Sequence, residues 1–83
     1  MSIGWRFSPD KIFNHRKLLT FLNNLQAERV KAVCITEEGT FAYNLAEDTL
    51  TELQIENCVE SRIEIISHDL DSNLGTYLLG CLQ

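Results

Sequence analysis

The sequence predicts an α+β fold, a two-layer sandwich in which a mostly antiparallel sheet of four to five strands carries two helices on one face. Three observations support this fold class. Strand-like and helix-like patterns follow one another in the order β-α-β-β-β-β-α. The turns between the middle strands are too short for parallel connections. With 83 residues, 45% of them hydrophobic, we expect a single domain over residues 1–83 with one core.

The first strand and the first helix come from clear local patterns. Residues 3–8 alternate apolar with small or polar side chains, which predicts a short strand with Trp5 and Phe7 on one face. A helix is predicted over residues 14–26, because Asn14 is a good N-cap and leucines recur after it at helical spacing. If the strands on either side of this helix lie side by side, the connection should be right-handed.

Four strands are predicted next. Residues 30–36 contain an apolar run, Ala32–Ile35, which is typical of a central strand that is covered on both faces. A short turn that ends at Gly39 leads into a returning strand over residues 40–45, and the two strands form the clearest hairpin in the sequence. Two further strands are predicted over residues 50–55 and 62–67.

The chain ends in a second predicted helix, with Asp71 as its N-cap. Gly75 and Gly80 weaken this helix by roughly 1 kcal/mol each relative to alanine, so its stability must come from packing on the sheet. The packing stripe consists of Leu74, Tyr77, Leu78, Cys81 and Leu82. The whole order is close to a ferredoxin-like fold without its last strand.

Composition excludes several classes of function. Seven Lys and Arg residues against twelve Asp and Glu residues give a net charge of −5, which argues against nucleic-acid binding. No apolar run approaches the roughly 20 residues of a membrane span, and the N-terminus lacks a signal-peptide pattern. We therefore expect a cytoplasmic protein without membrane association, in which three cysteines stay reduced.

No motif for catalysis, cofactor binding or metal binding is present. The four glycines are isolated, so no phosphate-binding loop exists, and we expect neither an enzyme nor a bound cofactor. The possible metal ligands lack the spacing of a zinc site. They are Cys34, Cys58, Cys81, His15 and His68. We expect Cys34 and Cys81 to be buried and His68 to be a solvated loop residue. A minimal metal carrier or enzyme that uses Cys58 and His68 stays an alternative.

One set of residues suggests a docking surface. Arg62 and Glu64 alternate with two isoleucines, so they face away from the helices if the isoleucines face the core. They form either an exposed cross-strand charge pair or, with Trp5 and Lys31, a surface on the open face of the sheet that docks on another domain. The alternative for Trp5 is a core or edge-covering aromatic.

An ordered set of short motifs resembles the C-terminal domain of CobW-type (cobalamin synthesis protein) P-loop GTPases, a metallochaperone family. The strand Arg29–Val33 resembles the family's R-x-K-G strand, with Ala32 in place of glycine. The segment Glu60–Ile66 resembles its D-S-R-x-E-x-I strand, with Glu60 in place of aspartate. Further matching segments are Gly4–Phe7, Phe13-Asn14 with Leu18 and Leu22, Gly39 with Tyr43-Asn44, and Leu70, Leu78 and Cys81-Leu82.

The resemblance implies an accessory domain of a GTPase that acts in metal trafficking or cobalamin cofactor assembly. It implies that GTP, Mg and Zn or Co are bound by a GTPase domain that lies outside these residues. The implied partners are the GTPase domain of the same parent chain, a client metalloprotein or a second copy in a homodimer. The alternative is a free-standing ferredoxin-like module that binds a small ligand or has a regulatory role.

Overall fold

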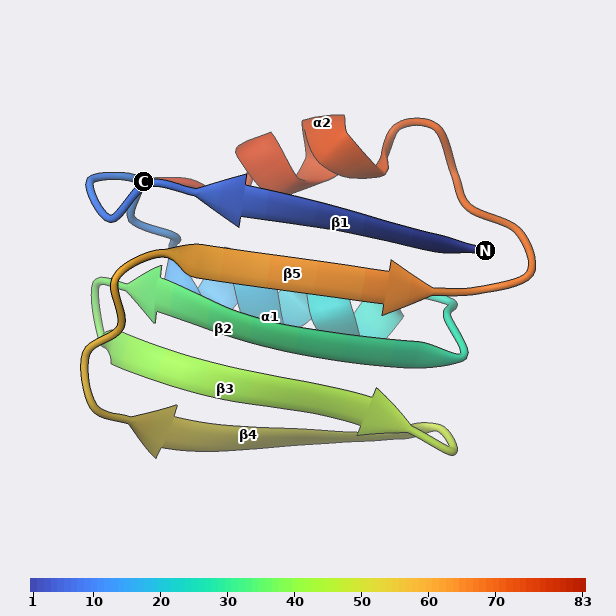
Figure 1. Cartoon of the computed structure of the whole chain (residues 1–83), viewed down its shortest axis with the longest axis horizontal. Helices are drawn as coiled ribbons and strands as arrows, with labels where there is room; N and C mark the ends of the chain where they lie inside the picture. The colour runs from blue at the N-terminus through green and yellow to red at the C-terminus, as the bar shows by residue number, and fades with distance from the viewer.

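The computed structural model describes all 83 residues as one five-stranded antiparallel sheet with two helices on one face, which confirms the predicted α+β class (Figure 1). Its elements are β1 (Ser2–Phe7), α1 (His15–Asn24), β2 (Arg29–Thr36), β3 (Gly39–Ala46), β4 (Thr49–Ile55), β5 (Ser61–Ile66) and α2 (Leu74–Leu79). Neither helix has the length and apolar character that crossing a bilayer requires.

The strand order in the sheet is β1-β5-β2-β3-β4, and every neighbouring pair is antiparallel. β1 and β2 therefore run parallel to each other with β5 inserted between them (Figure 1). β1 and β2, the strands on either side of α1, therefore do not lie side by side, and the expected right-handed connection between neighbouring strands does not apply. β5 reaches its place between them by returning from the far end of the β2-β3-β4 meander. β4 and β1 form the two edges of the sheet.

Residues directly opposite one another on neighbouring strands lie on the same face of the sheet. One row on the helix side consists of Trp5, Ile63, Ala32, Tyr43 and Glu52. The next row, on the other side, consists of Arg6, Arg62, Val33, Ala42 and Leu53. Fourteen buried residues form the core between the helix side of the sheet and the two helices.

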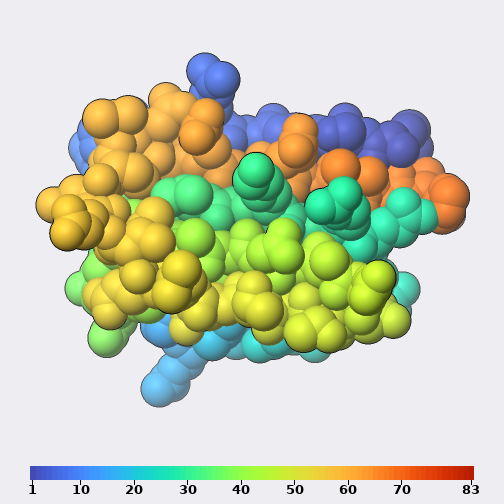
Figure 2. All heavy atoms as spheres, turned by 60° about the horizontal axis from the view of Figure 1, so that its bottom comes forward, coloured from blue at the N-terminus to red at the C-terminus, as the bar shows by residue number.

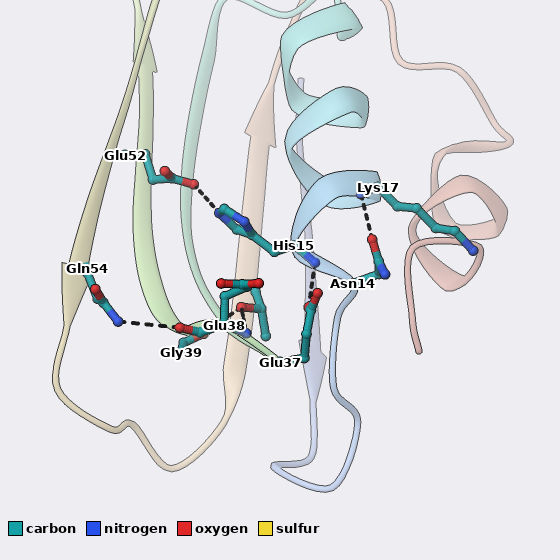
Figure 3. Close-up of polar contacts among 9 residues, drawn as sticks. Asn14, His15, Lys17, Glu37, Glu38, Gly39, Glu52 and Gln54 are labelled. Carbon is teal, nitrogen blue, oxygen red and sulfur yellow. Dashed lines mark hydrogen bonds and ion pairs between the residues drawn. The ribbon is translucent and has the colours of Figure 1, made fainter.

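The predicted start of α1 is confirmed. The side chain of Asn14 accepts a hydrogen bond from the Lys17 amide at 2.9 Å, and Glu37 in the β2–β3 turn accepts one from the His15 amide at 2.7 Å (Figure 3). These contacts satisfy two of the free N–H groups at the helix start. The helix buries Leu18 and Leu22, and it ends two residues before the predicted Gln26.

The second helix differs from its prediction at its start. Asn73, not Asp71, occupies the N-cap position, and the Asp71 carboxylate instead accepts a hydrogen bond from the Asn73 amide at 2.8 Å in the preceding turn. Leu74 and Leu78 are buried, whereas Tyr77 is 48% exposed. A six-residue helix with two glycines nearby depends on such packing for its stability.

Candidate functional site

The open face of the sheet, the side that no helix covers, carries an unusual share of the positive charge. Of the seven Lys and Arg residues, four lie on this face, whereas Glu64 is the only acidic residue that the strands place there. The four cations are Arg6, Arg29, Lys31 and Arg62. In Figure 2 the side chains of β2 (teal) project from this surface with no helix over them. The face is therefore basic although the chain is acidic.

Three of these cations surround a shallow hollow. Arg6 lies directly opposite Arg62, and Lys31 lies opposite Glu64 on the neighbouring strand. Gly4 of β1 lies opposite Glu64 on the other neighbouring strand. Because glycine has no side chain, the surface is depressed at this position. The hollow has a volume of about 570 Å³, and all five residues line it. The register thus places two guanidinium groups and one ammonium group around one uncovered spot.

The charges around the hollow are only weakly compensated. The Glu60 carboxylate lies 3.7 Å from Nε of Arg6 and 3.8 Å from Nε of Arg62, but these arginine side chains are 75% and 63% exposed. Ion pairs this exposed contribute little to stability. Lys31 and Glu64 form no ion pair within 4 Å, and Glu64 instead accepts a hydrogen bond from the Ser2 hydroxyl at 3.5 Å. The cations remain available to a partner.

Of the four residues predicted as a docking surface, the structure brings together Lys31, Arg62 and Glu64 but not Trp5. Trp5 lies opposite Ile63, so its side chain belongs to the helix side of the sheet. It packs against α2, where a methyl group added at Gly75 would lie 3.3 Å from Trp5 Nε1. The expectation that Trp5 shares the open face is wrong, and the edge-covering alternative is confirmed.

The helix side carries a polar cluster that the sequence did not indicate. His15 Nε2 lies 2.8 Å from a carboxylate oxygen of Glu52 (Figure 3). The His15 ring also stacks on Phe41 with centroids 4.6 Å apart. Tyr43 lies directly opposite Glu52 on the neighbouring strand, and its hydroxyl is buried without a hydrogen-bond partner. Burial, and then the nearby Glu52 carboxylate, raise the pKa of Tyr43 above its ordinary value. The β3–β4 register places Glu52 opposite Tyr43, and the packing of α1 on the sheet brings His15 to them. No local sequence pattern predicts either placement.

The cysteines and histidines do not converge on one site. Cys34 and Cys81 are buried as predicted, and burial raises the pKa of the Cys34 thiol to about 12. Cys58 and His68 lie beyond opposite ends of β5, a six-residue strand that spans about 20 Å. No three His, Cys, Asp or Glu side chains group together as a metal ion would require. His68 is exposed, as predicted, and contacts Glu28 at 2.5 Å.

A groove on the helix side is larger than the hollow on the open face. It has a volume of about 1250 Å³ and lies between the C-terminal end of α1, α2 and the loop before α2. Leu22, Ile65 and Leu74 form part of its apolar floor, and it has no Lys or Arg in its lining. Its acidic residues are Glu28, Asp48, Asp69 and Asp71. The groove is thus the electrostatic opposite of the open face.

No family model, no curated protein and no solved structure matches this chain. The resemblance to CobW-type GTPases stays a prediction.

Proposed function

We propose that this chain is a protein-interaction domain that docks on an acidic surface of a partner protein through the open face of its sheet. The arrangement of Arg6, Lys31 and Arg62 around the uncovered hollow supports this proposal most strongly. Guanidinium groups form charge-assisted, two-pronged hydrogen bonds with carboxylates, so two adjacent arginines suit Asp or Glu side chains. The helix side already stabilises the fold, which leaves these residues free to bind.

The open face has the mixed character of a protein interface. The row that begins with Arg6 and Arg62 continues across the sheet with Val33, Ala42 and Leu53, so a basic half adjoins an apolar half. Protein interfaces combine apolar contact area with a charged or polar rim in this way. The net charge of −5 weakens the long-range attraction to a polyanion such as a nucleic acid, which favours a protein partner for this face.

The resemblance to CobW-type GTPases suggests the first partner to test. Under this proposal the domain is an accessory part of a GTPase that acts in metal trafficking or cobalamin cofactor assembly. It would contact the GTPase domain or a client metalloprotein, and the nucleotide and the metal would be bound outside these residues. The lack of a phosphate-binding loop in the sequence is compatible with this role.

A titration followed by NMR tests the proposal. The isotope-labelled chain is mixed with a GTPase domain of the CobW type, loaded with GTP and Mg, and the backbone amide signals are recorded. We expect signals at Lys31, Arg62 and Glu64 to move, and Arg62→Glu to abolish the change. Arg16→Glu, which removes an exposed cation from α1 instead, is the matched control and should leave binding intact.

Two outcomes would reject the proposal. If the GTPase domain moves no signals, the accessory role is excluded, and if it moves only signals of the groove, the open face is not the docking surface. A single-stranded oligonucleotide serves as the competing probe. Tight binding of the oligonucleotide that weakens steeply with salt would favour a nucleic-acid partner over a protein.

The groove supports a second candidate, a module that binds a small ligand. Its apolar floor and its four carboxylates, with no Lys or Arg in the lining, favour a ligand with an aliphatic body and a cationic amine. An NMR titration with a long-chain alkylamine tests this function. Saturable shifts at Leu70 and Tyr77, with none at Arg62, would favour it, and no shifts at the groove would exclude it.

A further inference from the structure

The edge strand β4 is the least protected part of the sheet. β4 pairs only with β3, so the other side of its seven-residue backbone has no strand partner. Its side chains are exposed or half-buried along the whole strand. Figure 2 turns this edge toward the viewer and shows the β4 side chains (yellow-green to yellow) at the surface, with no other strand beside them. A row of unpaired N–H and C=O groups of this kind can form backbone hydrogen bonds with a further strand.

The two edges of the sheet differ in how well they are protected. Natural edge strands are usually blunted by lysine, proline, bulges or short length. β1 carries Gly4 in its middle and Arg6 near its end, both of which weaken pairing with a further strand. β4 contains no lysine, arginine, glycine or proline, pairs with β3 without interruption over all seven residues, and exposes 66% of Leu53.

We propose that β4 pairs with β4 of a second copy of this chain, antiparallel about a two-fold axis at Leu53. The two sheets then form one sheet of ten strands, because each sheet has five. A two-fold axis perpendicular to the sheet keeps both pairs of helices on one side and gives a closed dimer. This proposal does not depend on the docking function, because the pairing uses the backbone of β4 and not the cations around the hollow.

Side-chain chemistry selects this register over its neighbours. An axis at Leu53 places the two Leu53 side chains opposite each other on the open face, and Glu52 opposite Gln54 of the second copy on the helix side. An axis at Glu52 would oppose two carboxylates, and an axis at Gln54 would oppose Glu52 and Glu56. An axis at Thr51 would leave the exposed Leu53 without an apolar partner.

Glu52, the only charged residue of β4, does not prevent this pairing. An inward-pointing charge on an edge strand normally opposes pairing, because it would be buried without compensation. Here the carboxylate already contacts His15 Nε2 at 2.8 Å, and the Gln54 amide of the second copy would be a further donor. No like charges face each other in the proposed ladder.

Sedimentation velocity of the full chain tests the proposal. We expect the apparent mass to double as the protein concentration rises into the millimolar range. Leu53→Lys places two ammonium groups opposite each other at the axis and should keep the chain monomeric at every concentration. Leu79→Lys, on α2, is the matched control, because Leu79 is 59% exposed and lies away from β4; it should dimerise like the unmodified chain.

A cysteine series tests the register separately. In a Cys58→Ser background, which removes the thiol of the β4–β5 loop, Thr51→Cys, Leu53→Cys and Ile55→Cys each place one thiol on the open-face side of β4. Only Leu53→Cys should form a disulfide-linked dimer under mild oxidation, because only this residue faces itself across the axis. Preferential cross-linking at Thr51 or Ile55, a monomer at millimolar concentration, or a dimer that survives Leu53→Lys would each overturn the proposal.

Discussion

The two faces of the sheet are built from the same five strands, but their side chains have opposite surroundings. In β5, Ile63 and Ile65 are 2% and 0% exposed beneath the helices, whereas Arg62 and Glu64, which alternate with them, are exposed on the open face. The helix side therefore contributes the burial that stabilises a domain of this size. The open face contributes little to folding, so its cations can serve binding without a cost in stability.

The largest difference between the faces should appear when neighbouring residues of β5 are truncated. We expect Ile65→Ala to lower the free energy of unfolding by about 2–5 kcal/mol, because it leaves a cavity in the core. Glu64→Ala, one position away on the other face, should change it by less than about 0.5 kcal/mol. Urea unfolding of both variants measures this contrast. Equal losses would show that the open face is also needed for folding.

A smaller contrast should appear at alkaline pH in β2. Burial on the helix side raises the pKa of Cys34 from 9.0 to about 12, so the unfolded chain loses the thiol proton before the folded chain does. Above pH 9 the free energy of unfolding should therefore fall with rising pH, by up to about 1.4 kcal/mol per pH unit from this thiol. Below pH 9 the thiol contributes no slope.

Cys34→Ala and Val33→Ala separate this effect from other titrating groups. Cys34→Ala should reduce the alkaline slope, because it removes the buried thiol. Val33→Ala truncates the neighbouring residue on the open face and should leave the slope unchanged. Urea unfolding at several pH values between 9 and 11 gives both slopes. Identical slopes for Cys34→Ala and the unmodified chain would show that the thiol is not shielded from water on the helix side.

The sequence predicted what local patterns determine. The alternation in β5 correctly predicted that Arg62 and Glu64 lie on the other face of the sheet from the two isoleucines. Helical spacing after a good N-cap residue correctly located α1. The N-cap of α2 was misplaced because Asp71 and Asn73 are both capable caps, and local spacing does not choose between them. What stayed hidden depends on contacts between residues far apart in the chain.

The candidate site depends on such contacts between distant residues, so the sequence predicted it only in part. Lys31 joins Arg62 and Glu64 only because β5 inserts beside β2, a placement that no pattern in either strand reports. The face on which Trp5 lies follows from its pairing with Ile63, and the contact of His15 with Glu52 depends on where α1 packs on the sheet. Functional residues that come together from different strands can therefore be predicted only when the order of the strands is known.

The smallest expected effect concerns the helix that makes the two faces different. Asn14→Ala removes the oxygen that accepts from the Lys17 amide, and we expect it to lower the free energy of unfolding by about 1 kcal/mol. Asn23→Ala, at an exposed position in the last turn of α1, is the matched control and should cost less than about 0.5 kcal/mol. Thermal and urea unfolding give both values. Equal losses would mean that the Glu37 carboxylate, which already holds the His15 amide, is sufficient to fix the start of α1 over the core.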